Sequence, residues 1–339
     1  MIDIGHPAHV HFFKNTIFEL KKKDHQVLVT AMDKEVTIEL LKSYGIEHIV
    51  VGKKGKSTSN LLSQWVMRDL KILKIAYKFN PDILMGISNP CIAHSAWILR
   101  KKSIVFDDTE HASFAHKVTY PFANVICTPP CFQNDIGKKQ IRYNGYHELA
   151  YLHPNYFTPN PEVLNELGLA EGDPFIILRF VSWGASHDIG HHGIQNKLEF
   201  VKELEKYGRV LITSEADLGP EFEKYKIKVS PEKLHDLLYY ATLFLGESPT
   251  MTTESAILGT PAVCISSWAC NCGNFEDLSS KYGLIYCYKD EKEAISKGIE
   301  LLNANAKKKW LAKRNNLLSE KIDVTKFMVD LIEDCRIDK

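Results

Sequence analysis

Short apolar runs alternate along the first half of the chain with longer segments whose apolar positions recur every three or four residues. In the segment after the first run, Val10, Phe13 and Ile17 share one helical face, and a longer helix is expected over about 60–78. Alternation of this kind predicts a parallel sheet covered by helices. The apolar runs predict strands at 2–4, 25–31, 48–52, 81–86, 102–106 and 124–128.

The alternation breaks over 144–161, a stretch rich in proline and aromatic residues, and then restarts. The fold class is therefore α/β, with two Rossmann-like parallel-sheet domains facing a cleft. The expected parts are an N-terminal domain at 1–150, a C-terminal domain at 161–305, and closing helices at 306–339 that pack back across the cleft. The second set of strands is expected at 175–180, 209–213, 226–229, 243–246, 261–266 and 284–288.

The charge balance and the composition exclude some classes of function for this chain. The chain has 339 residues with 42 basic and 42 acidic side chains, so no overall positive charge indicates nucleic-acid binding. The first strand begins at Ile2, which leaves no room for a signal peptide, and no apolar run approaches the length of a membrane span. We therefore expect a cytoplasmic protein whose eight cysteines are free thiols without zinc-site spacing. Peripheral membrane association and the oligomeric state stay open.

Ligands of open parallel sheets bind beyond the carboxyl ends of the strands. In the second half, a strand ends at Gly246 and a helix begins among hydroxyl side chains. A helix N-terminus with hydroxyls beside it can hold phosphate, and Glu254, just after them, can accept a hydrogen bond from a ribose diol. The alternative is an N-capped helix with a buried polar turn. The hydroxyl side chains are Ser248, Thr250, Thr252 and Thr253.

This segment, ESPTMTTESAILGTPAV, resembles the nucleotide-sugar signature of GT-B fold proteins, which include the non-hydrolysing UDP-N-acetylglucosamine 2-epimerases and related glycosyltransferases. With the blocks DIGHPAHVHFFKN, FDDTEHA and RFVSWGASHDIGHHG, nearly the whole chain resembles the DUF354 family. The resemblance implies a GT-B fold. It also implies that the four hydroxyl residues contact the diphosphate and that Glu254 contacts the ribose.

The block at 179–193 follows the first strand of the second half. By the same resemblance, Arg179, Ser182 and His187 would touch the phosphates and the sugar, although Arg179 inside the strand can also be a structural ion-pair partner. The alternative is a metal site formed by His187, Asp188, His191 and His192. Adjacent histidines rarely converge on one ion, so we predict a polar loop and no metal.

Two loops of the first half can supply chemistry. Asp107, Asp108, Glu110 and His111 crowd together after one strand, where close carboxylates favour a general base; the alternative is a loop that caps the helix at Ser113. The opening loop carries three histidines in six positions. A three-histidine metal site is disfavoured there, because the first turn of the helix points these side chains in different directions. Gly5 and Pro7 shape a turn from which His6 or His9 faces the cleft, whereas His11 is structural.

The resemblance implies that the epimerases use acid and base groups on three loops. Here the loop after 81–86 carries Ser88 and Asn89 instead of a carboxylate, and 113–121 carries no carboxylate. We therefore expect a metal-independent glycosyltransferase, with base candidates Asp107, Asp108 and His9. No cofactor is predicted.

The donor substrate is expected to be a nucleotide-sugar of the UDP type. The acceptor stays open among a glycan, a lipid-linked molecule and a small molecule. Substrate contacts are expected from Gly5, His6, Glu110 and His111. The alternatives are a UDP-sugar epimerase or hydrolase with altered acid and base groups, and a nucleotide-sugar-binding protein without chemistry.

Overall fold

The structure, a computed structural model, describes residues 1–53, 61–181, 194, 196–214 and 217–337. The chain forms two compact units. Unit 1 comprises Met1–Tyr156 and Ile322–Lys339, and unit 2 comprises Phe157–Lys321. The closing helices at 306–339 were expected to form one part of the chain. In the structure they are divided, because one belongs to unit 2 and the other to unit 1.

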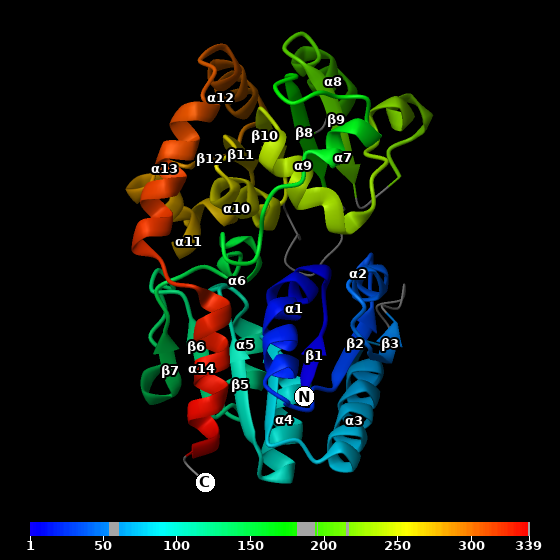
Figure 1. Cartoon of the computed structure of the whole chain (residues 1–339), viewed down its shortest axis with the longest axis vertical. Coiled ribbons are helices and arrows are strands. Elements are labelled where there is room, and N and C mark those ends of the chain that lie inside the picture. The colour runs from blue at the N-terminus through cyan, green and yellow to red at the C-terminus, as the bar shows by residue number, and fades with distance from the viewer. Residues whose placement is uncertain (54–60, 182–193, 195, 215–216, 338–339) are drawn as a thin grey trace. The chain divides into compact units, whose positions relative to one another are not determined.

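Unit 1 is built on a seven-stranded parallel sheet with the order β3-β2-β1-β4-β5-β6-β7 (Figure 1). The strand order reverses between β1 and β4, so their carboxyl ends flank the switch point at which such sheets bind ligands. The strands are β1 (Ile2–Ile4), β2 (Val29–Asp33), β3 (Ile49–Lys53), β4 (Ile83–Ile87), β5 (Lys102–Phe106), β6 (Val125–Thr128) and β7 (Gln140–Arg142).

The helices of unit 1 form two packed groups. In one group α1 contacts α2, α6 and α14, and in the other α4 contacts α3 and α5. The right-handed crossovers of a parallel sheet place such groups on opposite faces. The helices are α1 (Pro7–Lys22), α2 (Thr37–Ser43), α3 (Leu61–Phe79), α4 (Pro90–Leu99), α5 (Ser113–Thr119), α6 (Leu149–Leu152) and α14 (Val324–Ile337).

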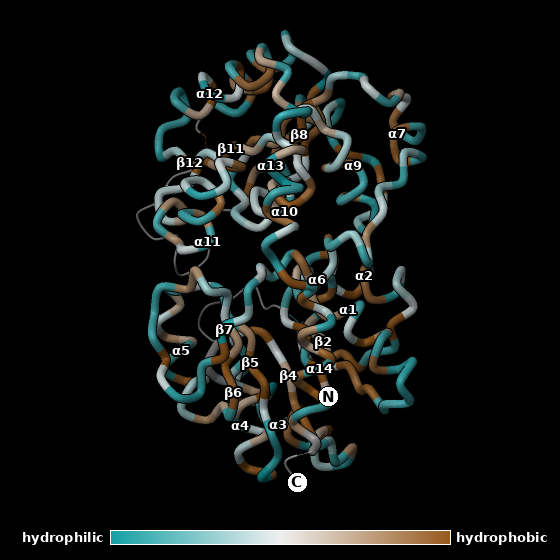
Figure 2. Tube along the Cα trace, turned by 60° about the vertical axis from the view of Figure 1, so that its left-hand side comes forward, coloured by the Kyte–Doolittle hydropathy of each residue, from teal (hydrophilic) through white to brown (hydrophobic). Residues whose placement is uncertain are grey.

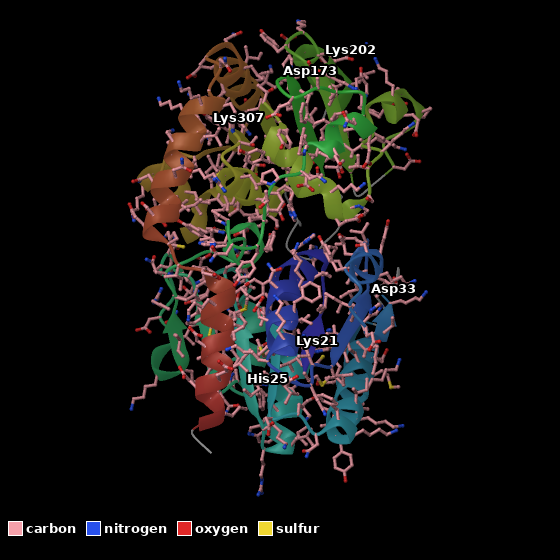
Figure 3. All side chains as sticks on the ribbon, in the orientation of Figure 1. Lys21, His25, Asp33, Asp173, Lys202 and Lys307 are labelled. Atoms are coloured by element: carbon pink, nitrogen blue, oxygen red, sulfur yellow. A yellow bond between two sulfur atoms is a disulfide. The ribbon has the colours of Figure 1, made fainter. Side chains whose placement is uncertain are left out.

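Helix α1 shows why the sequence folds as it does. His6 is the N-cap and its Nδ1 accepts a hydrogen bond from the Ala8 amide at 3.2 Å, and Pro7 suits the first helical position. Val10, Phe13 and Ile17 are fully buried, which confirms the expected apolar face. The last turn carries Lys21 and Lys22, of which Figure 3 labels Lys21, at the negative end of the helix dipole.

Helix α14 completes unit 1, although all of unit 2 precedes it in the sequence. It lies beside α1 (Figure 1), and the Thr325 hydroxyl donates to the Ala150 carbonyl at 2.7 Å. Gly145 has no side chain where Val324 packs: a Cβ there would lie 2.5 Å from Val324 Cγ2. The glycine therefore lets α14 dock closely. Figure 2 shows the hydrophobic positions concentrated on strands such as β5 and β6, between these helical layers.

Unit 2 is a five-stranded parallel sheet with the order β12-β11-β10-β8-β9. Its switch point lies between β8 and β10. A Cβ on Gly246 would lie 2.5 Å from the Arg179 carbonyl oxygen, so the two strand ends approach closely there. The elements are β8 (Phe175–Phe180), β9 (Arg209–Ser214), β10 (Leu243–Gly246), β11 (Ala262–Ile265), β12 (Ile285–Tyr288), α7 (Glu162–Glu166), α8 (Lys197–Leu204), α9 (Leu234–Tyr240), α10 (Pro249–Leu258), α11 (Gly273–Glu276), α12 (Glu291–Asn303) and α13 (Lys307–Glu320).

Short turns of 3₁₀ helix, and one of π-helix, connect several of these elements. The 3₁₀ turns are η2 (Gly137–Lys139), η3 (Pro220–Tyr225), η4 (Pro231–Lys233) and η5 (Ala269–Asn271), and the π turn is η6 (Asp277–Lys281).

Two expectations about local structure are wrong. The strand expected at 226–229 is a single bridge between Lys226 and Ile212, because the preceding turn η3 delivers only one residue to the edge of β9. The cysteines are not all free, because Cys270 and Cys287 form a disulfide with a Cα separation of 5.5 Å. The turn after β11 folds back over the neighbouring strand β12, and this brings the two sulfurs together.

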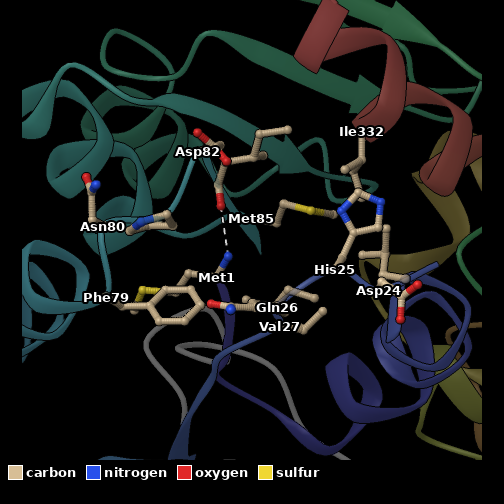
Figure 4. Close-up of a pocket in the computed structure, with 14 residues that line it drawn as sticks. Met1, Asp24, His25, Gln26, Val27, Phe79, Asn80, Asp82, Met85 and Ile332 are labelled. Atoms are coloured by element: carbon tan, nitrogen blue, oxygen red, sulfur yellow. Dashed lines mark hydrogen bonds between the residues drawn. The ribbon is translucent and has the colours of Figure 1, made fainter. Parts of the chain in front are cut away.

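A cavity of about 280 Å³ lies in unit 1 at the amino ends of β1 and β4. Its lining includes His25, Phe79 and Asp82, and the Met1 amine donates to the Ile83 carbonyl at 2.8 Å (Figure 4). This is the edge of the sheet opposite to the loops that follow the strands. The cavity is therefore separate from the candidate site described next.

Candidate functional site

The first half of the candidate site lies where three neighbouring strands of unit 1 end. β1, β4 and β5 are adjacent, so the loops that follow them meet at one edge of the sheet. Gly5 and His6 follow β1, Ser88 and Asn89 follow β4, and Asp107 directly follows β5. The structure thus brings together loops that are about 100 residues apart in the sequence.

The buried carboxylate of Asp3 makes hydrogen bonds that hold the loop after β4 in place. Asp3 in β1 has no exposed surface, and its Oδ2 accepts hydrogen bonds from Arg68 Nη2 and, at 2.5 Å, from Asn89 Nδ2. Its Oδ1 accepts from the Thr30 hydroxyl at 2.7 Å. Asn89 is also the N-cap of α4, where its Oδ1 accepts from the Ile92 amide. The network fixes the loop after β4, and nothing in the sequence pattern of α3 singled out Arg68.

Asp107, a predicted base, is fully buried and heavily hydrogen-bonded. Its Oδ2 accepts from the Ser88 hydroxyl at 2.8 Å and the Tyr120 hydroxyl at 3.0 Å, and it lies 3.2 Å from His116 Nε2. Its Oδ1 accepts from the Thr109 amide. Burial raises the pKa of the Tyr120 hydroxyl most, and the charge of Asp107 and its hydrogen bond with this hydroxyl raise that pKa further. The arrangement holds Asp107 in place and fits a positioning role.

Ser88 adopts a left-handed backbone conformation with φ 41°. Such a conformation strains a residue other than glycine, and here two hydrogen bonds hold it: the Ser88 amide donates to the Phe106 carbonyl, and the hydroxyl donates to Asp107. A strained residue at the end of β4 is the kind of feature that recurs at functional sites.

Asp108, the second predicted base, has more freedom than Asp107. Its side chain is 23% exposed, and its Oδ2 lies 3.2 Å from Nδ1 of His147. The imidazole packs against Phe12, with ring centroids 4.5 Å apart. His147 Nε2 is buried and has no hydrogen-bond partner among the described residues. A carboxylate that binds Nδ1–H leaves a lone pair on Nε2, which is the arrangement of a general base.

His147 is a residue that sequence reasoning missed. It lies in the proline- and aromatic-rich stretch at 144–161, where the alternation of strands and helices breaks, about 40 residues after Asp108. The one signal in the sequence was a histidine among aromatic residues just before α6.

The three histidines of the opening loop make different contacts. His11 is buried, and its ring packs against Tyr44 and Tyr151 with centroids 5.8 and 5.4 Å away. His6 lies 3.8 Å from Glu35, whereas His9 Nδ1 accepts from the Gly5 amide at 3.3 Å. Within the described ranges, no three His, Cys, Asp or Glu side chains are grouped to hold a metal ion.

His9 supplies a pH-dependent prediction. Burial lowers the pKa of His9 well below 6.5, and the nearby cations, His6 first, lower it further. As the pH falls below about 6.5, the unfolded chain binds a proton on His9 before the folded chain does, so stability should fall by up to about 1.4 kcal/mol per pH unit. His9→Asn, which can still accept from Gly5, should flatten this dependence. Urea unfolding from about pH 7.5 to about pH 5 measures both slopes, and equal slopes would contradict the assignment.

The other predicted residues of the β5 loop lie beyond Asp108. Glu110 Oε1 accepts from the Gln133 amide at 3.4 Å, and the Glu110 carbonyl accepts from Asn134. His111 is exposed. A Cβ added to Gly5 would lie 3.8 Å from the nearest atoms of the His9 ring, which is an ordinary van der Waals contact. The contact roles of these residues stay predictions.

In unit 2 the candidate site is the start of α10. Ser248 is the N-cap, and its Oγ accepts from the Met251 amide at 3.3 Å. Ser248 and Thr250 are partly exposed, whereas Thr252 and Thr253 are buried and donate to the Ser248 and Pro249 carbonyls. The two outer residues are therefore partly accessible at the helix start, whereas the two inner hydroxyls stabilise it.

Glu254 is 4% exposed and lies 3.0 Å from Nε2 of His235, which comes from the neighbouring helix α9. The buried pair fixes the carboxylate six residues, more than one and a half helical turns, after the N-cap Ser248. His235 was not among the residues that the sequence predicted.

Glu247, which the sequence also did not single out, joins two strand ends. It is buried, its Oε2 accepts from the Val181 amide at 2.9 Å, and its Oε1 accepts from the Ile194 amide at 2.7 Å. These two residues bracket the loop of the predicted contacts Ser182 and His187, both of which lie outside the described residues. Arg179, before this loop, donates from Nη1 to the Thr213 hydroxyl at 2.8 Å. One carboxylate thus fixes both ends of the loop beside the start of α10.

Comparisons with known proteins agree with this architecture. An uncharacterized protein of Methanocaldococcus jannaschii is 26% identical over 275 residues, which are 77% of this chain and 80% of that protein. The UDP-GlcNAc 2-epimerase of Neisseria meningitidis, solved with UDP-GlcNAc bound, has a TM-score of 0.67 at 13% identity, covering 100% of this chain and 99% of its own. Spinosyn forosaminyltransferase has a TM-score of 0.63 at 12% identity, covering 98% and 99%.

At such low sequence identity, the structural similarity establishes the fold alone. The predicted GT-B architecture with two parallel sheets is therefore confirmed. The sequence model of the family described as "Protein of unknown function (DUF354)" matches residues 1–335. The chain therefore belongs to the DUF354 family and has the fold shared by UDP-GlcNAc 2-epimerases and GT-B glycosyltransferases.

Proposed function

We propose that this protein is a metal-independent glycosyltransferase that takes its sugar from a UDP-sugar. Unit 2 binds the nucleotide at the start of α10, and unit 1 binds the acceptor and supplies the base. The solved neighbours support this class of donor, because one was solved with UDP-GlcNAc bound and another is a sugar transferase.

The observation that carries the proposal is the Asp108–His147 pair, with an imidazole nitrogen that has no partner among the described residues. Because His147 Nε2 is buried in this structure, the side chains that cover it must move aside when the acceptor binds. The acceptor hydroxyl then hydrogen-bonds to His147 Nε2 and gives up its proton as its oxygen forms the new bond to the anomeric carbon. The bond from that carbon to the diphosphate breaks, and the diphosphate leaves with the electron pair. Asp108 keeps the imidazole oriented and stabilises its positive charge.

The departing diphosphate also needs stabilisation. At the start of α10, Pro249 has no amide hydrogen and the Met251 amide already donates to Ser248 Oγ. The diphosphate would therefore meet the Thr250 amide, the positive end of the helix dipole and the partly exposed hydroxyls of Ser248 and Thr250. Preorganised donors of this kind can replace a metal ion at the leaving group.

Epimerisation is the second candidate, because UDP-GlcNAc 2-epimerases share the fold. The loop after β4 argues against it: Asn89 is committed to Asp3 and to capping α4, and Ser88 to Asp107, so this loop offers no acid or base.

Incubation with UDP-GlcNAc tests the proposal. Released UDP and the stereochemistry of the sugar are followed together, with and without lipid-linked, glycan and small-molecule acceptors. Release of UDP only with an acceptor, unchanged by a chelator, supports metal-independent transfer. A new epimer, or UDP released without acceptor, supports an isomerase or hydrolase instead. Binding without turnover of any donor supports a binding protein.

A separate prediction concerns the ribose contact. Glu254→Gln keeps an oxygen for His235 but removes the charged acceptor, so the affinity for UDP should fall about tenfold, the worth of one charge-assisted hydrogen bond. Isothermal titration calorimetry measures the change. The matched control is Glu199→Gln, an exposed residue of α8 in the same unit. If both variants bind UDP like the unaltered chain, Glu254 does not contact the nucleotide.

A further inference from the structure

One helical face of unit 1 is unusually apolar for a surface. Of the ten large apolar side chains that are exposed in the described part of the chain, seven belong to α3, α4 and α5. Tyr77, Phe114 and Trp97 are 74%, 71% and 63% exposed. We call this set the α3–α5 face; its members are Val66, Met67, Leu70, Tyr77, Trp97, Ile98 and Phe114.

Ring contacts join the three helices into one continuous surface. Trp65 of α3 lies 6.0 Å from Phe114 of α5 and 6.4 Å from His94 of α4, measured between ring centroids. Phe122 lies 4.7 Å from His94 and 5.5 Å from Trp97. These contacts link Phe114 to Trp97 across the three helices. Val66, Leu70 and Tyr77 recur at helical spacing on one side of α3, and apolar patches of this kind mark binding surfaces.

The charges on these helices have one sign at the surface. Lys71, Lys74 and Lys78 are exposed on α3, and Lys117 is exposed on α5. The only carboxylate in the three helices is Asp69, which is partly buried, with its Oδ2 2.7 Å from His94 Nδ1. The face thus combines aromatic and aliphatic side chains with lysines.

We propose that the α3–α5 face binds the surface of a phospholipid bilayer that contains anionic lipids. Tryptophan, tyrosine and phenylalanine suit the boundary between headgroups and acyl chains, and lysines attract anionic headgroups. A second copy of the chain fits less well, since a two-fold contact would bring the lysines of both copies into one interface with Asp69 as the one carboxylate of the three helices to offset them. No described helix is long and apolar enough to cross a bilayer, so the face lies on the membrane and does not span it.

Vesicle co-sedimentation tests the proposal without reference to any activity. The full chain is mixed with vesicles of phosphatidylcholine alone or of phosphatidylcholine with phosphatidylglycerol. We expect binding to the anionic vesicles that weakens with salt. Lys71→Glu with Lys74→Glu should lower the partition coefficient by at least about tenfold, because each basic residue contributes about a fivefold factor. Trp97→Ala with Phe114→Ala should lower it by a similar factor.

The matched controls lie off the face. Lys202→Glu with Lys289→Glu changes the same charge on exposed lysines of unit 2 (Figure 3 labels Lys202), and Val36→Ala removes an exposed apolar group from unit 1. These variants should bind like the unaltered chain, and all variants should keep its thermal unfolding midpoint.

Three results would overturn the proposal. The first is that the chain binds neutral and anionic vesicles equally well, or binds neither. The second is that the control variants lose as much binding as the variants of the α3–α5 face. The third is that light scattering shows a dimer, which the double variant Trp97→Ala with Phe114→Ala dissociates.

Discussion

Replacing His147 by glutamine should lower the rate of sugar transfer by about 10²–10⁴-fold, the usual contribution of a general base. Glutamine can still donate a hydrogen bond to Asp108, so the pocket beside Phe12 stays filled, but the amide cannot accept a proton from the acceptor. The affinity for UDP should not change, because the nucleotide is assigned to unit 2. Steady-state rates with saturating donor, together with UDP titrations, separate the two effects.

The chain contains a matched control for this experiment. His94 also binds a carboxylate through Nδ1, with Asp69 at 2.7 Å, but its Nε2 is already within 2.9 Å of the Val118 carbonyl. His94→Gln therefore removes a histidine from a similar pair without removing an available lone pair, and transfer should continue. Equal loss in both variants would mean that the His147 effect is structural.

Asp3→Ala should destabilise the folded chain by about 3–5 kcal/mol, the cost of removing one partner from a buried ion pair. The substitution leaves the Arg68 guanidinium without its carboxylate and frees the Asn89 amide from its anchor. The free energy of unfolding from urea titrations gives the magnitude. A cost below about 1 kcal/mol would show that water or neighbouring groups replace the carboxylate.

A double variant tests whether the cost comes from the stranded charge. Asp3→Leu with Arg68→Met removes both partners, and it should recover a large part of the stability lost in Asp3→Ala. If the double variant is as unstable as the sum of the single ones, the network stabilises mainly through Thr30 and Asn89.

The hydrophobic pattern predicted most of the fold because a parallel sheet produces it directly. A strand such as β5, buried on both faces, needs a continuous apolar run, and an outer helix such as α1 needs one apolar stripe. The hydrophobic pattern gave wrong predictions where the position of a segment in the folded chain determines its structure. The segment 226–229 has strand-like composition but meets β9 at one residue, and Cys270 reaches Cys287 only because β11 and β12 are neighbours.

The candidate site was predictable only in part, for a related reason. Asp107 and Asp108 could be found from their place after a strand, because every parallel strand delivers its following loop to the same edge. His147, Arg68 and Glu247 come from a connecting stretch, the middle of a helix and a strand end, and their roles depend on contacts across the sheet. Sequence spacing carries no record of such contacts.

The place of α14 in unit 1 has a consequence for how the protein is made. The ribosome produces the seven strands of the larger sheet first. The contacts of Gly145, Ala150 and α1 with α14 form only later, because α14 is synthesised after all of unit 2. Unit 2 is one continuous stretch and can fold as soon as it emerges. The first unit to begin is therefore the last to be completed, and until then its α1 surface is open to chaperones or to wrong partners in the cell.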